Sequence, residues 1–297
     1  LGKKIELSKS FFGKILGNKL ASTFSAPPMI LAQLSGVSRS INHEIKAYHT
    51  SEVCDIEKDT EVAVILGSMV DYNNEIKFMR ELRKSHSDIK IIVVGSFPSA
   101  MPEIYESQAD FIVKGDPELA FQDILIKGFP KEKIIQSKRP QDLNILPMPF
   151  WEPFIKNNYY AKRPFSDQLG VSIQKSKGCS MTCNYCPYAS FYGKAQHYDS
   201  DYVLKMINYY KEKHNINYFM FRDPNFGENR KEFHIFMEKL IESKLNISWS
   251  CEARLDTFKK DSSSKNSVSM GFPVNPYLWR GSLEVISFMP LSSADPF

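Results

Sequence analysis

Apolar positions in residues 27–130 alternate between two patterns. Short extended segments are predicted at 44–48 and 62–66, a buried strand at 89–94 and a further strand at 111–113. Helical spacing predicts helices at 74–84, through Ile76, Met79 and Leu82, and at 117–126. Strands that alternate with helices predict an α/β fold, here an open and mostly parallel sheet with helices on both faces.

Two turns of small residues follow neighbouring strands of this predicted sheet. Gly67-Ser68 comes after the strand at 62–66, and Gly95-Ser96 after the strand at 89–94. Ligands of open parallel sheets bind outside the carboxyl ends of the strands. These four residues are therefore candidates for ligand contacts.

A domain boundary is predicted at residues 138–160, because 138–153 contains four prolines and cannot continue a helix or a central strand. The first domain then covers 1–137 and the second 161–261, followed by a tail at 262–297.

The second domain again alternates. Its predicted strands cover 170–174, 218–221 and 247–251, and its predicted helices cover 201–214, with Ser200 as N-cap, and 229–245. Three strands with two intervening helices predict a parallel βαβαβ unit, the first part of a barrel or open sheet.

Charge and composition narrow the classes of partner. The chain has 38 Lys and Arg against 34 Asp and Glu, a net charge of +4 without clustering, so nucleic acid is not an expected partner. It has no apolar run of about 18 residues, so no membrane span is expected. Five cysteines are an odd number for a disulfide framework, which favours the reducing cytoplasm and a metal site.

Three of the cysteines form the strongest motif of the chain. Cys179, Cys183 and Cys186 have C-x3-C-x2-C spacing and directly follow a predicted strand. Three thiolates on one short loop can bind three corners of a [4Fe–4S] cluster and leave one iron open. Zinc is an alternative, with His197 as a poorly spaced fourth ligand, and a chance grouping of buried thiols is another.

The segment 177–186, with Tyr185 before the last cysteine, resembles the signature of the radical S-adenosylmethionine (radical SAM) superfamily. The resemblance implies a radical SAM β/α barrel in which the three cysteines hold a [4Fe–4S] cluster. It also implies that S-adenosylmethionine chelates the open iron and is cleaved to a 5′-deoxyadenosyl radical. Tyr185 would then lie near the adenine.

Two later segments resemble the same family. Residues 221–226 close the second strand, and the resemblance implies that Asp223 takes the methionine amine. Residues 250–256 resemble the end of the third strand, where Glu252 or Arg254 would meet the methionine carboxylate or the ribose. Cys251 is expected to be a buried core thiol.

The first domain resembles the cobalamin-binding domain of one large radical SAM class, which includes anaerobic magnesium-protoporphyrin ester cyclase-like enzymes and methylases. Residues 27–32, 93–98 and 113–118 carry the resemblance. The loop that supplies a histidine to cobalt is absent, because His43 and His49 do not fit it. If cobalamin binds at the turns of Gly67, Ser68, Gly95 and Ser96, its cobalt would therefore have no histidine ligand.

This resemblance implies an enzyme for methyl transfer or oxidative cyclisation of a small-molecule substrate, with a reducing partner such as flavodoxin or ferredoxin. The catalytic residues stay unassigned. A non-catalytic iron–sulfur protein for electron transfer or sensing is the main alternative, although such carriers normally saturate their irons with cysteine. A small zinc-binding module is a third.

The tail is rich in Ser and Pro, poor in charge and without helical periodicity. We therefore expect residues 262–297 to be irregular or not the native continuation. Since only three barrel strands are predicted, we also expect an incomplete catalyst with low solubility and weak affinity for S-adenosylmethionine, clipped by proteases near 258–270.

Overall fold

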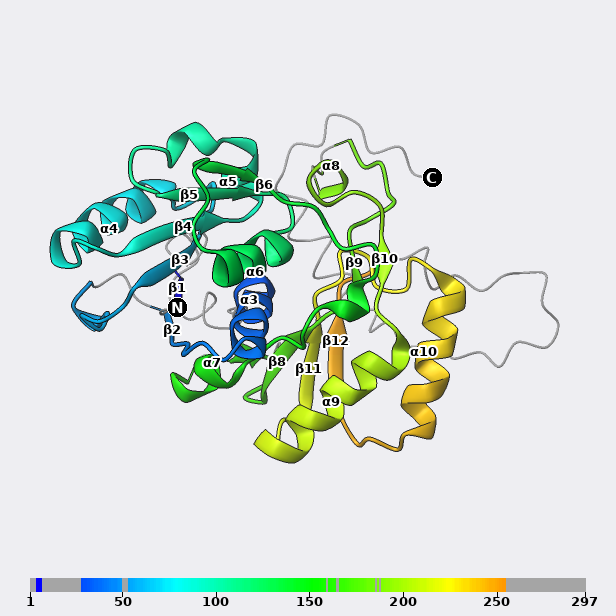
Figure 1. Cartoon of the computed structure of the whole chain (residues 1–297). Coiled ribbons are helices and arrows are strands. Elements are labelled where there is room, and N and C mark those ends of the chain that lie inside the picture. The colour runs from blue at the N-terminus through cyan, green and yellow to red at the C-terminus, as the bar shows by residue number, and fades with distance from the viewer. Residues whose placement is uncertain are drawn as a thin grey trace, which may run out of the picture. The chain divides into compact units, whose positions relative to one another are not determined.

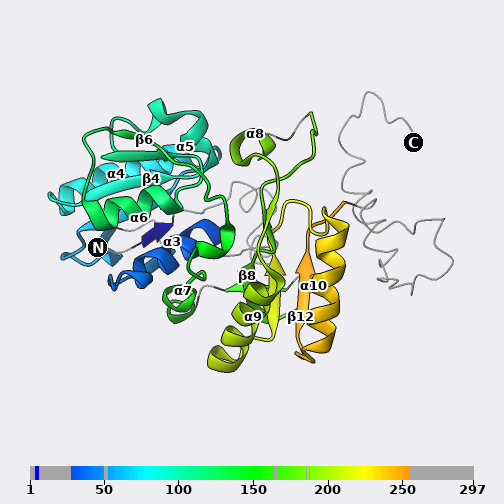
Figure 2. The same cartoon turned by 45° about the vertical axis from the view of Figure 1, so that its right-hand side comes forward.

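The computed structural model describes residues 4–6, 28–49, 53–158, 160–163, 166–184, 186 and 188–254. Contacts within the chain group residues Leu1–Thr257 into one compact unit, whose described residues hold two mainly parallel sheets (Figures 1 and 2). The predicted tail and the predicted cleavage region lie outside the described residues.

The first sheet has the strand order β2-β1-β3-β4-β5-β6, and every neighbouring pair in it is parallel. Its strands are β1 (Lys4–Glu6), β2 (Ala47–His49), β3 (Val62–Leu66), β4 (Lys90–Val94), β5 (Phe111–Lys114) and β6 (Ile134–Gln136). Its helices are α3 (Met29–Ser40), α4 (Tyr72–Ser85), α5 (Ser96–Ala100) and α6 (Glu118–Lys127), with short 3-10 turns at Val53–Asp55 and Pro102–Ile104.

Both faces of the central strands β3, β4 and β5 are buried, which explains their unbroken apolar runs. Val62 and Val64 of β3 join the core under α3 and α6, whereas Ala63 and Ile65 join the core under α4. The predicted α/β fold is thereby confirmed, and β3, β4 and β5 lie where the sequence predicts them.

Several features of the first sheet differ from the sequence-based expectation. The pattern does not predict β1, β6 or α5. The strand expected at 44–48 begins later, at Ala47. Helix α3 was not predicted, because its residues 31–38 are buried on all sides, including Gln33, Ser35 and Ser38, so no polar face marks it.

The second sheet has the order β12-β11-β8-β7. Strands β8 (Leu169–Ile173), β11 (Tyr218–Phe221) and β12 (Ser248–Cys251) are parallel and alternate with helices α9 (Ser200–His214) and α10 (Arg230–Glu242). This is the predicted βαβαβ unit. Strand β7 (Ala161–Lys162) adds an antiparallel edge that was not predicted. The predicted N-cap is wrong: Asp199, one residue earlier, occupies the N-cap position of α9.

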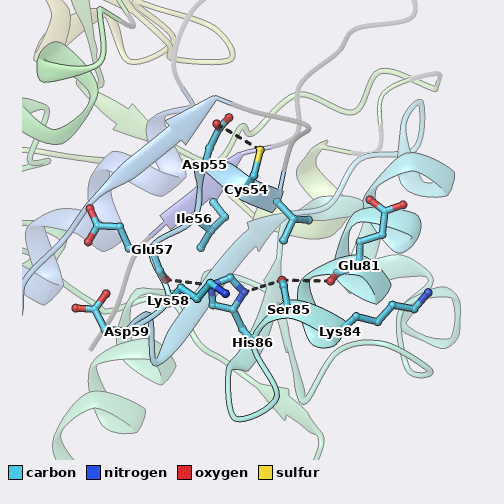
Figure 3. Close-up of a pocket in the computed structure, with 11 residues that line it drawn as sticks. Cys54, Asp55, Ile56, Glu57, Lys58, Asp59, Glu81, Lys84, Ser85 and His86 are labelled. Atoms are coloured by element: carbon cyan, nitrogen blue, oxygen red, sulfur yellow. Dashed lines mark hydrogen bonds between the residues drawn. The ribbon is translucent and has the colours of Figure 1, made fainter.

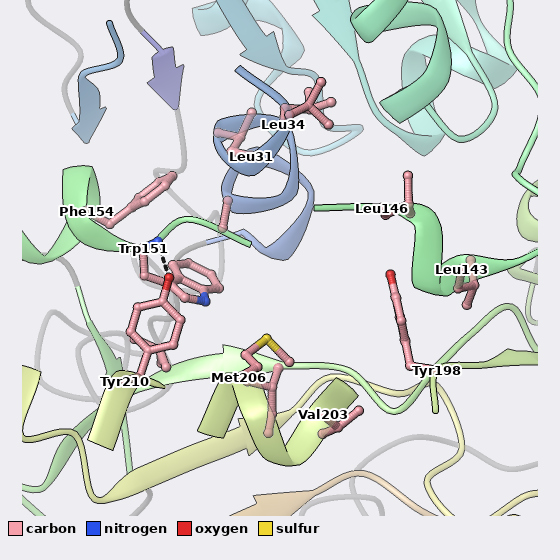
Figure 4. Packing of buried hydrophobic residues seen from close by; sticks show 14 of the residues in the cluster. Leu31, Leu34, Leu143, Leu146, Trp151, Phe154, Tyr198, Val203, Met206 and Tyr210 are labelled. Carbon is pink, nitrogen blue, oxygen red and sulfur yellow. Dashed lines mark hydrogen bonds between the residues drawn. The ribbon is translucent and has the colours of Figure 1, made fainter. Parts of the chain in front are cut away.

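The proline-rich segment between the sheets is packed into the protein. It contains a 3-10 turn (Leu143–Ile145) and α7 (Glu152–Lys156). The backbone N–H of Trp151 donates to the Tyr210 hydroxyl (3.0 Å; Figure 4), which donates to the Pro149 carbonyl (2.7 Å). One core cluster therefore runs from α3 through this segment to α9, and its members include Leu31, Leu34, Leu143, Leu146, Trp151, Phe154, Val203, Met206 and Tyr210.

Candidate functional site

The three cysteines lie on one loop at the carboxyl end of β8. The chain passes from β8 through β9 (Ser176–Lys177) into the loop, and then through α8 (Tyr188–Tyr192) to β10 (Gln196–His197), which pairs antiparallel with β9. The N–H of Cys179 donates to the carbonyl of Gly193 (3.0 Å) and closes the loop. Gly178 has φ +89°, and a Cβ there would lie 2.4 Å from the Lys194 carbonyl oxygen, so the entry to the loop requires glycine.

All three cysteines of the loop are free thiols. Cys179 and Cys183 are half-buried and Cys186 is exposed. Burial raises the pKa of Cys179. Within the described part of the chain, no three Cys, His, Asp or Glu side chains already converge as a metal site. The donor set still fits an iron–sulfur cluster, because three unpaired thiols lie within eight residues of one loop.

Asp223 lies at the base of this loop, just after β11. Its buried carboxylate accepts hydrogen bonds from the N–H of Lys175 (3.1 Å to each oxygen), from the N–H of Ser176 and from the Ser176 hydroxyl (2.6 Å). Burial raises its pKa to about 6, and these donors oppose the rise. In this structure Asp223 therefore holds the start of β9, so the contact with a methionine amine stays a prediction.

The other predicted S-adenosylmethionine contacts lie at the end of β12. Glu252 forms an exposed ion pair with Arg222 (2.7 Å). Arg254 donates its N–H to Asn225 (3.0 Å), and its Nη1 lies 3.9 Å from Cys183 Sγ. The structure thus brings Arg254 to the cysteine loop, whereas Tyr185 lies outside the described residues. Cys251 is half-buried rather than fully buried.

Glu228 is a neighbour of the cysteine loop that the sequence did not reveal. It follows the turn after Asp223, and its Oε1 accepts the N–H of Ser180 (2.8 Å). It also raises the pKa of Cys179. A carboxylate beside this thiol disfavours the bare thiolate, so the charge of a bound metal would have to offset it.

The second group of predicted residues lies at the carboxyl edge of the first sheet. The N–H of Ser68 donates to both oxygens of Glu75 (3.0 and 3.1 Å), and the Tyr105 hydroxyl donates to Oε2 (2.7 Å). Burial raises the pKa of Glu75 to about 7. A Cβ on Gly67 would lie 2.8 Å from the Tyr105 hydroxyl, so glycine is needed above this network. Sequence reasoning found Gly67 and Ser68 but missed Glu75 and Tyr105.

The neighbouring turn is tied to the next strand by a serine. Ser99 donates to the carbonyl of Gly95 (2.6 Å) and accepts the N–H of Gly115 (3.0 Å), so the ends of β4 and β5 are joined beside Ser96. Met69 and Val70, directly after Ser68, are 69% and 52% exposed. Small turns with adjacent exposed apolar side chains fit the apolar face of a large planar ligand such as cobalamin.

A separate hollow of about 770 Å³ lies at the opposite, amino-terminal end of the first sheet (Figure 3). Residues 53–59, before β3 and including Cys54, line it together with Glu81, Lys84, Ser85 and His86, before β4. His86 contacts the Glu57 carbonyl (3.1 Å) and the Ser85 hydroxyl (2.8 Å). This hollow contains none of the predicted site residues.

Comparison with solved structures identifies the fold. The cobalamin-dependent S-adenosylmethionine radical enzyme OxsB, solved with aqua-cobalamin bound, matches 89% of this chain and 40% of its own length (TM-score 0.67, 12% identity). The radical S-adenosylmethionine methyltransferase TsrM from Kitasatospora setae, solved with cobalamin and a [4Fe–4S] cluster, matches 82% of this chain and 51% of its own length (TM-score 0.57, 11% identity).

Curated relatives agree with this match. An uncharacterised methyltransferase of Synechocystis is 23% identical over 221 residues, 72% of this chain and 39% of the relative. An anaerobic magnesium-protoporphyrin IX monomethyl ester cyclase of Synechocystis is 26% identical over 202 residues, 61% of this chain and 39% of the relative. The predicted resemblance to radical SAM enzymes of the cobalamin class is confirmed.

These curated relatives are longer than this chain, which spans 39% of each of the two proteins. A family model described as "Domain of unknown function (DUF3576)" matches residues 272–297, in the predicted tail. No described helix is long and apolar enough to cross a membrane.

Proposed function

We propose that the chain provides the cofactor-binding part of a radical SAM enzyme that uses cobalamin for methyl transfer or oxidative cyclisation of a small-molecule substrate. The observation that carries this proposal is the loop of Cys179, Cys183 and Cys186, three free thiols at the carboxyl end of a parallel strand. The relatives named methyltransferase and cyclase support the reaction class.

The residues of this chain would hold and orient the cofactors. The three cysteines would ligate a [4Fe–4S] cluster, and Arg254, beside Cys183, would pair with the carboxylate of S-adenosylmethionine, with Tyr185 and Glu252 as further contacts. When bound, the cluster supplies an electron that cleaves S-adenosylmethionine to a 5′-deoxyadenosyl radical, and cobalamin supplies a methyl carrier or redox centre.

The carboxyl edge of the first sheet would bind cobalamin. The turns that face the ligand would be formed by Gly67, Ser68, Gly95 and Ser96, and the exposed Met69 and Val70 side chains would give apolar contact. His43 and His49 do not fit the missing histidine loop, so cobalt would lack a histidine ligand. We also propose a cytoplasmic protein that receives electrons from flavodoxin or ferredoxin.

Anaerobic reconstitution with iron and sulfide tests the cluster. We expect about four irons and four sulfides per chain, and loss of the brown charge-transfer absorption in Cys179→Ala, Cys183→Ala and Cys186→Ala proteins. Cys54→Ala and Cys251→Ala serve as matched controls that keep the absorption. If the protein instead contained zinc and no sulfide, the small zinc-binding module would be the better assignment. A cluster that also needs Cys251 would be saturated by cysteine and would favour the electron carrier.

Titration with hydroxocobalamin tests the first domain. We expect binding, with a cobalt(II) electron paramagnetic resonance spectrum that lacks nitrogen splitting from the lower face. Nitrogen splitting that disappears in a His43→Ala or His49→Ala protein would contradict the proposed mode. Absence of any binding would remove cobalamin from the proposal and leave the cluster untouched.

A further inference from the structure

One arginine outside both predicted sites binds the two ends of the cysteine loop. Arg139 lies in the segment between the two sheets, and its side chain is only 12% exposed. Its Nη1 donates to the carbonyls of Lys177 (3.1 Å) and Lys194 (2.9 Å), and its Nη2 donates to the carbonyl of Tyr192. Lys177 enters the loop, and Tyr192 and Lys194 leave it. One guanidinium therefore closes the base of the loop.

The same arginine is fixed from the other side by the first sheet. Its Nε donates to Oδ2 of Asp116 (2.6 Å), in the turn that follows β5. The other oxygen of Asp116 lies 2.8 Å from the ammonium of Lys177, which also binds Glu118. Two carboxylates and two cations thus form a buried group without net charge, the arrangement in which buried ions are tolerated.

This group joins the two edges that carry the predicted sites. Gly115, next to Asp116, donates its N–H to Ser99, and Ser99 donates to the carbonyl of Gly95. On the other side, Lys177 lies two residues before Cys179. A guanidinium suits this place because its several N–H donors in a rigid plane can serve three carbonyls and a carboxylate together.

We propose that Arg139 is a positioning residue for the cysteine loop, and that the Asp116 turn of the first sheet fixes it in place. By holding the entry and exit of the loop, Arg139 sets the separation of Cys179 from the rest of the triad before any metal binds. The role of Arg139 in cluster binding rests on the proposed function. Its contacts with the cysteine loop are those of the metal-free chain and can be tested without a cluster.

The test measures how fast each thiol of the metal-free protein is alkylated, resolved by mass spectrometry, with the exposed Cys54 as internal reference. In Arg139→Gln the alkylation of Cys179 relative to Cys54 should accelerate by about tenfold or more, because the loop loses several hydrogen bonds from a charged donor. In Arg139→Lys, which keeps the charge beside Asp116, the acceleration should be smaller.

Arg83→Gln is the matched control. Arg83 also donates to a carbonyl, that of Gln108 (3.0 and 2.8 Å), and pairs with Asp110 (2.6 Å), within the first domain. This variant should leave the Cys179 ratio unchanged. An unchanged ratio in Arg139→Gln, or an equal acceleration in Arg83→Gln, would overturn the inference. If Arg139→Gln does not fold, the comparison of Arg139→Lys with Arg83→Lys decides in the same way.

A second measurement separates this inference from the proposed function. After reconstitution, iron should pass to a chelator at least several-fold faster from Arg139→Gln than from wild type or Arg83→Gln, well below the unfolding midpoint of each protein. A wild-type chain that never assembles a cluster would refute the proposed function, while the alkylation ratio would still decide the role of Arg139.

Discussion

Each of the two sheets has a buried carboxylate at its carboxyl edge, but the two carboxylates accept hydrogen bonds from different donors. At the edge of the first sheet, Glu75 accepts one backbone N–H and one neutral phenol, and its pKa is raised to about 7. At the edge of the second, Asp223 accepts two backbone N–H groups and a hydroxyl, and its pKa is raised to about 6. Both carboxylates hold the turn that follows a parallel strand.

At both turns burial outweighs the hydrogen-bond donors, because the pKa rises from 4.5 to about 7 at Glu75 and from 3.8 to about 6 at Asp223. Burial raises the pKa of both groups, and each hydrogen bond to the ionised form lowers it again. The turn at the first sheet therefore rests on an acid that titrates near neutral pH. The turn below the cysteine loop rests on an acid that is mostly ionised there.

The largest effect is expected from Asp223→Ala. It leaves the N–H groups of Lys175 and Ser176 and the Ser176 hydroxyl without their acceptor in a buried place. At about 1–3 kcal/mol for each buried unsatisfied group, the free energy of unfolding at pH 7.5 should fall by roughly 3–5 kcal/mol in urea denaturation. Asp201→Ala, which breaks only the exposed pair with Lys239, should change it little. Similar losses in both would refute the role of Asp223.

Glu75→Gln should change how stability depends on pH. Because the pKa of Glu75 is raised from 4.5 to about 7, its contribution to stability is full below pH 4.5 and is lost as the pH rises through 7. The variant lacks this loss. Between pH 4.5 and 8, the unfolding free energy of the variant should therefore gain about 3 kcal/mol relative to wild type. Parallel urea curves for the two proteins across this range would contradict the predicted pKa.

Tyr105→Phe should have a smaller effect that also depends on pH. It removes the hydroxyl that donates to Glu75, so it should cost about 1–2 kcal/mol at pH 8, where the acid is ionised, and less at pH 5. Tyr202→Phe is the control, because the Tyr202 hydroxyl donates to the Leu146 carbonyl (3.0 Å), which does not titrate. Its cost should be equal at both pH values.

Met69→Ser should weaken cobalamin binding but leave the free energy of unfolding nearly unchanged. Met69 is 69% exposed, so the free energy of unfolding should change by less than about 0.5 kcal/mol. If the first sheet binds cobalamin at this edge, its affinity measured by absorbance titration should fall by a few-fold. Ile126→Ser, on α6 and 61% exposed, should change neither. Equal cobalamin affinity in all three proteins would remove Met69 from the proposed site.

Sequence reasoning worked where a pattern is local. The consecutive apolar residues of β3 and β4 predict strands because both faces of the sheet are buried, and the cysteine spacing predicts one loop. It failed for α3, whose buried polar residues hide the helical period, and for β7, a pair of residues on an edge.

The supporting residues of the sites could not be read from the sequence because their partners are distant along it. Tyr105 and Glu75 are 30 residues apart, and Arg139 and Lys194 are 55 apart. The resemblance implies an ammonium as the partner of Asp223, yet its oxygens accept the backbone N–H groups of Ser176 and Lys175, 47 and 48 residues earlier. The charge of a carboxylate indicates that it needs a hydrogen-bond donor or a cation nearby, but only the three-dimensional structure identifies that group.

The packed segment at residues 138–160 has a consequence for how such chains can recombine. Trp151 and Phe154 belong to the same core cluster as Leu31 of the first domain and Met206 of the second. The two domains therefore share one hydrophobic core and are not independent modules joined by a flexible linker. A chimera that takes either half from a relative must inherit the matching segment and the faces of α3 and α9, and an exchange within it should divide one core into two mismatched surfaces.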